Sequence, residues 1–391
     1  MKNTPALDGL RVVDFSRLLP GPWCTQMLAD LGAEVVKVES PEGDPSRHNP
    51  PRQRSHSAYF AGVNRGKRSV VLDLRSADGA DAARRLIARA DVVIESFAVG
   101  VAQRLGIDYA AARVLKPDLV YCSVSGFGQD GPLAASPGHD LVVQAGSGVL
   151  GVGPAGAMPA FQAADYAGAT YALIGILAAL HKKRSTGEGA FLDIAMFDGL
   201  MAMGDIALTG ALARANGQSG TPMMEVWGGN PRYAIYPTAD GRFVAVSLLE
   251  KRLWARFCDA IGRADLVFDD ERPEHRHTDH GERAAHYRAA ITDYCARHSA
   301  AEIDRAMQAR DVPVRVVASP DEALASDHAR ARGMVYQEDD PHDGRVTRLG
   351  NPLARSGLAA ARHRPPPLLG EHTAEVLAEL GLSPPSTKGQ P

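Results

Sequence analysis

Short apolar runs separated by amphipathic stretches dominate the first part of the chain. Residues 10–15 and residues 35–38 predict strands. Between them, the turn at Gly21-Pro22 begins a predicted helix that Gly32 ends. This order of strand, helix and strand favours neighbouring parallel strands. The turn lacks the GxGxxG and P-loop patterns, so neither of these nucleotide-binding motifs is supported.

The same alternation continues over the following hundred residues. Residues 40–57 are polar and contain several prolines, which predicts a loop. Further strands are predicted at residues 69–74, 91–95 and 119–124, and an amphipathic helix at residues 80–90. Strands that alternate with helices predict an α/β domain, whose ligands are expected at the C-terminal ends of the strands.

The second half of the chain is predicted to be largely helical. Residues 166–182 predict a long helix, and residues 191–215, rich in Ala, Met and Gly, predict a second helical stretch. A hairpin is predicted within residues 233–247, and helices within the charged residues 253–309. Residues 383–391 are predicted to form a disordered tail.

The composition is that of an ordinary globular protein, and it limits the classes of function. The 391 residues suit two domains, or one domain with a large insertion. The formal net charge of -3 does not indicate a nucleic-acid-binding protein. The 4 cysteines contain no CxxC pair, which argues against a structural zinc site or a disulfide framework. The histidines of residues 275–280 are interpreted as solvated, so no metal is predicted.

The apolar pattern does not predict a membrane or secreted protein. The N-terminus lacks the apolar core of a signal peptide. The longest apolar candidate, residues 171–180, is shorter than the roughly 18 residues that a membrane helix needs. A cytoplasmic protein without a membrane partner is therefore expected.

Residues 137–166 carry the strongest candidate chemistry. Two proton-transfer groups, His139 and Asp165, stand at the ends of a stretch rich in Gly and Ala, which let backbone approach a ligand closely. A carboxylate in an apolar setting is costly unless it is paired or used. The alternative is that His139-Asp140 forms a loop turn and that Asp165 is the N-cap of the helix at residues 166–182.

Several motifs, in order over nearly the whole chain, resemble those of family III CoA-transferases, the CaiB/BaiF group. They are Gly21-Pro22 with residues 31–39, and residues 64–69, 126–132, 186–189 and 368–373. The group includes CoA-transferases and α-methylacyl-CoA racemases. The resemblance therefore implies an enzyme that acts on a CoA thioester and needs no prosthetic group, but it does not imply a single reaction.

The resemblance implies that Asp165 is catalytic. In transferases the matching aspartate is the nucleophile that forms an acyl-aspartyl anhydride, and in racemases it is one of two bases around the α-carbon. Racemase-like members carry the Gly-His-Asp found here as Gly138-His139-Asp140, whereas many transferases carry Tyr in place of the His. Residues 244–250 resemble a racemase segment that ends in a catalytic-pocket Glu, here Glu250.

These residue types suit proton transfer at the α-carbon of a thioester. The reaction needs a base on one face and an acid on the other, and His139 and Asp165 can exchange these roles, each step contributing roughly 10²–10⁴-fold. Glu250 would hold His139 in one tautomer. Backbone N–H groups near the start of the Asp165 helix would stabilise the enolate oxygen.

The resemblance also implies residues that bind CoA. Arg104 is expected to contact a phosphate or the adenine, because a guanidinium matches phosphate geometry. Relatives often carry Phe-Arg-Pro-Gly where this chain has Phe97-Ala98-Val99-Gly100, and this departure affects part of the CoA grip or the local turn. The expected set is Arg104, Leu72, Asp73, Leu74, Arg75, Ser96, Phe97, Gly138 and Asp140.

The implied fold class is α/β, with a Rossmann-like large domain and a smaller α+β domain in an interlocked homodimer. Residues 1–190 would form the N-terminal part of the large CoA-binding domain, and residues 191–221 a linker helix. Residues 222–325 would form the small domain, and residues 326–391 a return segment that completes the large domain, with the C-terminal tail. The active site would lie between the large domain and the partner's small domain, so Glu250 would come from the other chain.

Three functions are compatible with these residues. The favoured one is epimerisation of 2-methylacyl-CoA thioesters, by α-proton abstraction and re-addition using His139 and Asp165. The first alternative is a family III CoA-transferase that moves CoA between an acyl-CoA and a carboxylic acid through Asp165, which the transferase-like residues 141–145 support. The second is a catalytically silent CoA-ester-binding protein, which the departure at Ala98-Val99 favours.

Overall fold

The chain folds into two compact units, which are described separately. A computed structural model describes residues 5–153, 156–359 and 364–383. Unit 1 contains residues 1–147, 158–203 and 326–391, and unit 2 contains residues 148–157 and 204–325. The tail predicted at residues 383–391 lies outside the described residues from residue 384 onward.

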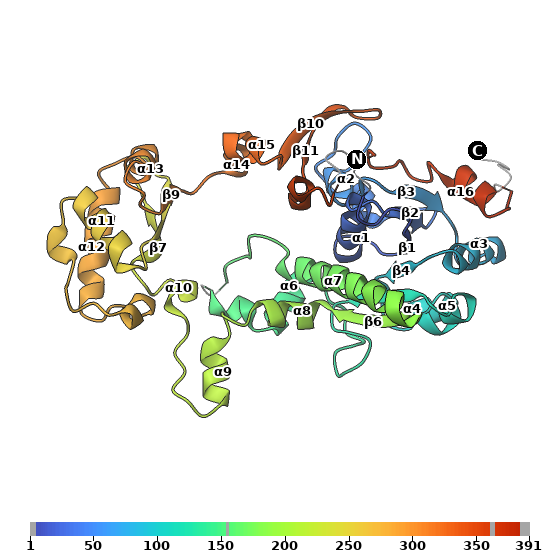
Figure 1. The fold of residues 1–391 in the computed structure, drawn as a ribbon, viewed down its shortest axis with the longest axis horizontal. Helices are drawn as coiled ribbons and strands as arrows, with labels where there is room; N and C mark the ends of the chain where they lie inside the picture. The colour runs from blue at the N-terminus through green and yellow to red at the C-terminus, as the bar shows by residue number, and fades with distance from the viewer. Residues whose placement is uncertain (1–4, 154–155, 360–363, 384–391) are drawn as a thin grey trace. The chain divides into compact units, whose positions relative to one another are not determined.

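A six-stranded parallel sheet forms the centre of unit 1 (Figure 1). The strands are β1 (Arg11–Asp14), β2 (Glu34–Glu39), β3 (Arg68–Val71), β4 (Val92–Glu95), β5 (Val120–Ser125) and β6 (Ala190–Ala195). Their order, β3-β2-β1-β4-β5-β6, reverses between β1 and β4. The predicted α/β class with a parallel sheet is confirmed. In such sheets ligands bind at the reversal, outside the C-terminal ends of the strands.

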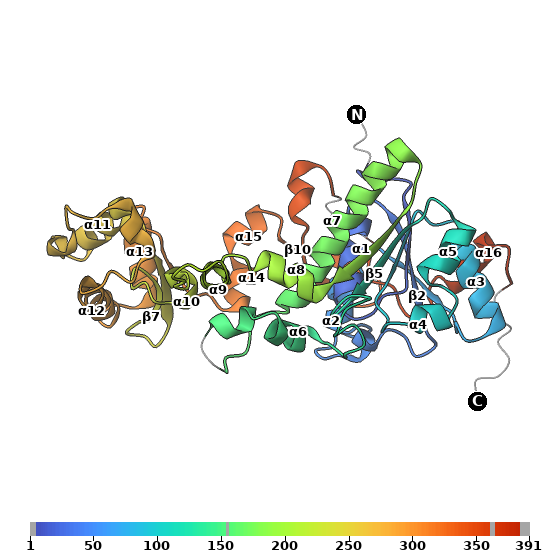
Figure 2. The same cartoon turned by 90° about the horizontal axis from the view of Figure 1, so that it is seen from below.

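Helices cover both faces of this sheet (Figure 2). One face carries α1 (Pro20–Asp30) and α7 (Ala163–Thr186), and the other carries α3 (Ala77–Ala88), α5 (Tyr109–Leu115) and α16 (Thr373–Glu379). Val12 packs with Leu28 in the first core, and Val13 packs with Leu86 in the second. Successive strand residues point to opposite faces, so one short strand contributes to both cores.

The edge strand β6 corrects one prediction. The sequence predicts a helical stretch over residues 191–215, but Ala190–Ala195 pair in parallel with β5 along the whole strand. Helices begin only afterwards, at α8 (Met196–Met203) and α9 (Thr209–Ala215). Phe191 packs on Tyr121 of β5, and this pairing outweighs the helical preference of the Ala and Leu residues. The linker helix predicted at residues 191–221 is therefore wrong at its start.

Helix α7 is longer than the sequence predicts. It extends from Ala163 to Thr186, and by length and composition alone it could cross a membrane, whereas the predicted apolar run was confined to residues 171–180. A core helix of a soluble protein passes the same test. Helix α7 packs on α1 and on the sheet, and Ala172 and Ile176 lie in the core of unit 1. These contacts account for part of the apolar composition, because other apolar side chains of the helix, such as Ile174, are exposed.

Unit 2 is built on an antiparallel sheet in the order β7-β8-β9. Its strands are β7 (Tyr233–Pro237), β8 (Phe243–Ser247) and β9 (Val314–Val316), and its main helices are α11 (Lys251–Ala260), α12 (Arg283–Cys295) and α13 (Ala300–Gln308). The predicted hairpin turns at Gly241, whose φ of +75° suits glycine. Trp254, Phe257 and Tyr287 fill the core between the sheet and these helices.

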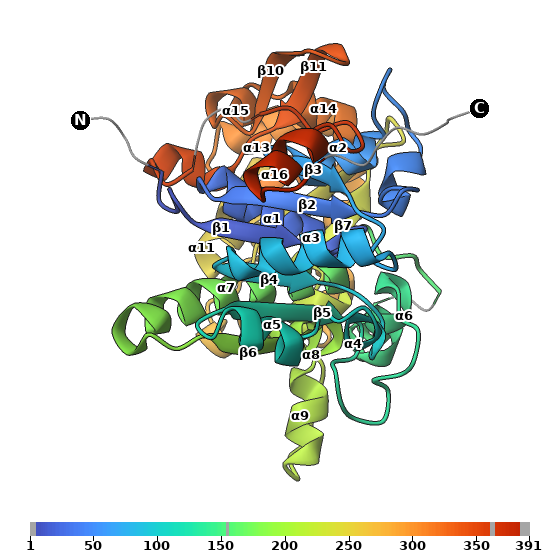
Figure 3. The ribbon, with the colours of Figure 1, turned by 90° about the vertical axis from the view of Figure 1, so that its right-hand side faces the viewer.

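The last described segment of the chain returns to unit 1. Its hairpin, β10 (Val335–Asp340) and β11 (Gly344–Leu349), lies near helix α2 (Ala58–Asn64) in Figure 1, and Asp343 at the turn bonds His56 at 2.6 Å. Figure 3 shows α16 beside β3, where the N–H of Gly370 donates to Ser69 Oγ at 2.9 Å. Residues from both ends of the sequence therefore build one unit.

Candidate functional site

A cavity of about 450 Å³ in unit 1 contains both predicted proton-transfer residues. Its walls come from the loops after β1 and β4, the end of β5 and the start of α7. We name it the Asp165 pocket. Its lining includes Arg17, Tyr59, Ser96, Gly138, His139, Asp140 and Asp165. The pocket lies where the strand order reverses, the place at which a doubly wound sheet binds ligands.

Asp165 lies in the first turn of α7 but does not cap the helix. The helix begins at Ala163, and Asp140 Oδ1 accepts the N–H groups of Ala164 at 2.8 Å and Asp165 at 3.2 Å. The alternative in which Asp165 is the N-cap is therefore wrong, because Asp140 performs that role from a distant part of the chain. These two N–H groups are already bonded, which also removes them as the expected donors to an enolate oxygen.

The Asp165 carboxylate has no hydrogen-bond donor or cationic partner among the described residues. Burial, and after it the charge of Asp140, raises its pKa to about 7. Tyr59 lines the same pocket, and burial, followed by the charge of Asp165, raises the pKa of its phenol. A carboxylate that titrates near neutrality in a cavity, without a structural partner, is a candidate for chemistry.

Two other predicted residues, Gly138 and His139, stand beside Asp140. His139 is exposed, lines the pocket and precedes the short helix α6 (Asp140–Gly146). A Cβ at Gly138 would lie 2.7 Å from the Phe127 ring, so a larger residue would push this segment out of place. Gln144 donates to Asp140 Oδ2 at 2.7 Å and fixes the carboxylate that caps α7. Asp140 therefore positions Asp165.

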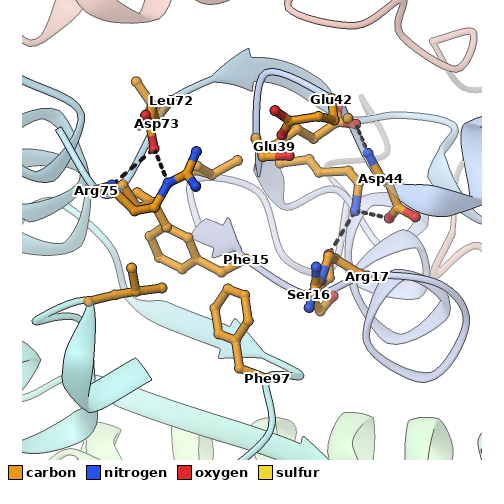
Figure 4. A pocket seen from close by; sticks show the side chains of 16 residues that line it. Phe15, Ser16, Arg17, Glu39, Glu42, Asp44, Leu72, Asp73, Arg75 and Phe97 are labelled. Carbon is orange, nitrogen blue, oxygen red and sulfur yellow. Dashed lines mark hydrogen bonds and ion pairs between the residues drawn. The ribbon is translucent and has the colours of Figure 1, made fainter. Parts of the chain in front are cut away.

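A second cavity, of about 340 Å³, lies over the C-terminal ends of β1, β2 and β3. We name it the Arg75 pocket. It gathers predicted CoA-binding residues from two loops, namely Leu72, Asp73, Leu74, Arg75 and Phe97. In Figure 4 the Asp73 carboxylate accepts from the guanidinium of Arg75, at 3.0 Å. Ser96 lines the Asp165 pocket instead, and Arg104 lines neither, although its neighbour Leu105 lines the Arg75 pocket.

A buried charge network supports the loop between β1 and α1, and the sequence reasoning missed it. Lys67 Nζ lies 3.0 Å from Asp14 Oδ2, and Lys37 Nζ lies 2.9 Å from Asp44 Oδ2. Burial alone would raise the pKa of Asp14, but the charges of Lys67 and Lys37, together with hydrogen bonds from Ser16 and Thr25, outweigh it and lower that pKa to about 2. Asp44 also accepts the N–H of Leu18, whose φ is +65°. The network therefore holds the strained loop between β1 and α1, which borders both the Asp165 pocket and the Arg75 pocket.

Sequence reasoning also missed Arg17 and Tyr59. Arg17 lies three positions after the end of the first strand, and the rule that ligands bind at the C-terminal ends of strands could have identified it. Tyr59 belongs to α2, a short helix directly after the predicted loop at residues 40–57, and no pattern in the sequence indicated a site there. Both residues are placed by tertiary contacts, and both line the Asp165 pocket.

Glu250 lies in unit 2, apart from these residues in the chain. It is the N-cap residue of α11, its side chain is exposed, and Arg276 lies 3.8 Å away. Its predicted contact with His139 stays a prediction. The residues that the structure describes contain no group of three or more His, Cys, Asp or Glu that could hold a metal ion.

These features define an α/β protein with two cavities at the C-terminal ends of its sheet strands, both lined by Arg17. The family model of CoA-transferase family III matches residues 7–373. The succinate–glutarate CoA-transferase of Agrobacterium fabrum is 35% identical, over 96% of this chain and 96% of that protein. The human α-methylacyl-CoA racemase is 33% identical, over 97% of this chain and 94% of that protein.

Solved structures agree with this assignment. A CAIB/BAIF family protein from Brucella suis has a TM-score of 0.81 and 31% identity, covering 96% of this chain and 100% of that chain. The chain therefore belongs to CoA-transferase family III, as the motifs predicted, and is an enzyme of that family. Enzymes of the family use CoA thioesters as substrates. The relatives support the transferase alternative better than the favoured racemase.

Proposed function

We propose that the protein transfers CoA from an acyl-CoA thioester to a carboxylic acid, with the Asp165 carboxylate as the nucleophile. The observation that carries this proposal is the Asp165 carboxylate itself, which lines a cavity, has no cationic partner and has a pKa raised to about 7. The relatives named as CoA-transferases support the same reaction. An unpaired carboxylate is available to attack, whereas a carboxylate held by a cation is a poorer nucleophile.

The chemistry balances without an oxidant or an additional proton. Attack of an Asp165 oxygen on the thioester carbonyl breaks the C–S bond, forms an acyl-aspartyl anhydride and releases CoA as the thiolate. The thiolate then attacks the Asp165 carbonyl carbon, which forms an aspartyl-CoA thioester and releases the first acid. The second acid repeats the two steps in reverse order and leaves with CoA. Asp165 returns to the free carboxylate at the end.

The two pockets divide the substrate in this proposal. The Arg75 pocket would hold the nucleotide part of CoA, since it gathers Leu72, Asp73, Leu74, Arg75 and Phe97 beside a guanidinium that suits phosphate. Ser96 and Arg104 would add further contacts to CoA beside this pocket. The thioester would then reach the Asp165 pocket, where Asp140 and Gly138 keep the start of α7 in place. Tyr59 would donate to the carbonyl oxygen as negative charge develops there.

The direct test traps the anhydride. The enzyme is incubated with an acyl-CoA alone and then with hydroxylamine or borohydride, and the peptide that contains Asp165 is analysed by mass spectrometry. A modification on Asp165 that requires the acyl-CoA supports the proposal. An enzyme that transfers CoA between two acids without ever modifying Asp165 would refute this role. A protein that binds CoA esters but neither transfers CoA nor becomes modified on Asp165 would be the catalytically silent CoA-ester-binding protein.

Racemisation is the second candidate, because His139 and Asp165 line the same cavity and the human racemase is a relative. In that reaction each residue would serve one face of the α-carbon, with Glu250 supporting His139. Incorporation of deuterium at the α-carbon of a 2-methylacyl-CoA, in heavy water and without an acceptor acid, would favour the racemase. Transfer without such exchange would exclude it.

The predicted homodimer is part of the proposal. Large apolar side chains on α7 and α8 are exposed in the single chain, including Ile174, Met201 and Met203. A partner would remove this surface from water. Light scattering on the purified protein measures the mass directly, and a monomer at assay concentration would contradict the dimer. If Glu250 acts across chains, mixing inactive Asp165→Asn and Glu250→Ala subunits should restore part of the activity.

A further inference from the structure

Arg17 is the residue that the two pockets share. It lines the Asp165 pocket and also the Arg75 pocket, and the other described residues of the two linings differ. In Figure 4, Arg17 lies beside Ser16, on the side of the Arg75 pocket opposite Asp73 and Arg75. A ligand that extends from one cavity into the other must therefore pass this side chain.

The backbone on both sides of Arg17 is fixed, whereas its side chain is exposed. The N–H of Arg17 donates to Ser96 Oγ at 3.0 Å, and the N–H of Ser16 donates to Asp14 at 2.9 Å. On the other side, Leu18 donates to Asp44 and keeps a left-handed φ of +65°. A strained and fully bonded loop that presents a free side chain is a preorganised arrangement for binding.

The charge of Arg17 is not used within the described part of the protein. No carboxylate lies within ion-pair distance of its guanidinium among the described residues, whereas Arg47 lies 2.7 Å from Glu39 and Arg65 lies 2.6 Å from Asp30. Its guanidinium lies 5.4 Å from the centre of the Phe97 ring. Stacking on a ring orients a guanidinium but leaves its N–H groups free to bind an anion.

The Asp165 pocket needs a cation if an acid is to enter it. Arg17 is the permanently charged cation among the described residues that line this pocket, and the two acidic residues there are Asp140 and Asp165. An incoming carboxylate would meet repulsion from these two groups. The planar fork of a guanidinium binds a carboxylate through two parallel hydrogen bonds and offsets that repulsion.

We propose that Arg17 binds a carboxylate of the acyl substrate that is remote from the reacting carbon, and so selects dicarboxylic acids. The inference rests on the proposed transfer to a carboxylic acid and names the class of that acid. One carboxylate of the acid reacts through Asp165, and the second pairs with Arg17. The phosphates of CoA bind elsewhere, beside Arg75, so Arg17 discriminates between acyl groups and contributes little to the affinity for CoA.

The test compares acceptor acids of equal length that differ by one carboxylate. Transfer from a neutral acyl-CoA to succinate or glutarate is measured beside transfer to butyrate or valerate, in the wild type, Arg17→Gln and Arg17→Lys. We expect KM for the dicarboxylic acids to rise about 10- to 100-fold in Arg17→Gln, the effect of losing a hydrogen bond to a charged group. The values for the monocarboxylic acids should change by less than about threefold, and Arg17→Lys should restore part of the difference.

Calorimetry of free CoA binding distinguishes a role of Arg17 in selecting the acid from a role in binding CoA. Binding of free CoA should be unchanged in both variants and weaker in Arg75→Gln. Arg113→Gln, an exposed position on α5, is the control for a surface charge. Equal weakening toward CoA and toward every acid would overturn the inference, and so would a variant that keeps the wild-type preference. Melting curves check that the variants are folded.

A wild-type enzyme that transfers CoA to no acid would refute the proposed function and not the anion site. In that case, succinate binding to the wild type that Arg17→Gln abolishes would still support the site. A wild type that binds or uses butyrate to the same extent as succinate would overturn the inference that Arg17 selects dicarboxylic acids.

Discussion

Two carboxylates in unit 1, the buried Asp14 and the half-buried Asp165, have pKa values shifted in opposite directions. Asp14 lies under the loop after β1, where two lysine charges and two hydroxyl hydrogen bonds together outweigh the cost of burial and lower its pKa to about 2. Asp165 lies in a cavity, where burial and the neighbouring Asp140 raise its pKa to about 7. Burial alone therefore does not set the charge of a carboxylate, because its partners decide the sign of the shift. The paired carboxylate holds structure, and the unpaired one is available for reaction.

Among variants that test this comparison of Asp14 with Asp165, the largest expected effect is the loss of activity when Asp165 is replaced. Asp165→Asn keeps the size of the side chain but removes the proposed nucleophile, so the proposed transferase activity should fall by about 10⁴- to 10⁶-fold. Initial rates of acyl transfer measure this loss, with the exposed Asp8→Asn as the control. Asp165→Asn with near-normal turnover would show that the unpaired carboxylate is not the reacting group.

The next effect in size is on stability, and it concerns Asp14. Asp14→Asn leaves Lys67 buried without its anion and weakens the support of Lys37, which should lower the free energy of unfolding by about 3–5 kcal/mol. Urea unfolding followed by circular dichroism measures the change. The double variant Asp14→Asn with Lys67→Met removes both charges and should recover part of the loss. If Asp14→Asn unfolds at the same urea concentration as Asp8→Asn, the network is not needed for stability.

The contrast also predicts how activity depends on pH. A nucleophilic carboxylate must be ionised, and the pKa of Asp165 is about 7, so kcat/KM should be constant above that pH and fall about tenfold per pH unit below it. Asp14, with a pKa of about 2, stays ionised throughout this range. A rate that does not change between pH 5 and pH 8 would contradict the raised pKa, and a bell-shaped profile would favour the acid–base pair of a racemase.

The smallest effect is a change in stability at Asp165 itself. The folded pKa of Asp165 lies above the ordinary value of 3.8. The stability that the protonated carboxyl contributes is therefore complete below pH 3.8 and is lost as the pH rises through about 7. Asp165→Asn avoids the buried charge and should melt about 2–5 °C higher than the wild type at pH 8. The difference should vanish near pH 4. Equal melting temperatures at pH 8 would mean that solvent stabilises the ionised group.

The sequence predicted the elements of the fold that depend on local pattern. Alternating apolar runs identified five of the six parallel strands, and the edge strand Ala190–Ala195 was missed because its Ala and Leu residues also suit a helix. The motif around His139 and the position of Asp165 led to residues of one pocket. The acid strength of Asp165 could not be predicted, because it depends first on burial in the pocket and then on Asp140, whose capping contact spans 25 positions.

The remaining features of the site depend on contacts between still more distant residues. The pairing of Asp14 with Lys67 spans 53 positions, and neither residue has a local pattern that indicates a buried ion pair. Arg17 is an ordinary exposed arginine in the sequence, and only the three-dimensional structure places it at the junction of two cavities. Pattern reveals elements and motifs, whereas charge states follow from the tertiary fold.

The return of residues 326–383 to unit 1 has a consequence for biosynthesis. Ser69 receives the N–H of Gly370 across 301 positions, and α16 covers β3 only after most of the chain has left the ribosome. Until then, the nascent sheet exposes β3 and the apolar face that receives Val376 and Leu377. Domains usually fold as units during synthesis, with the N-terminal one first, and we expect completion of unit 1 to wait for α16. Ribosomes that stall within unit 2 should therefore carry a protease-sensitive β3, and release past α16 should protect it.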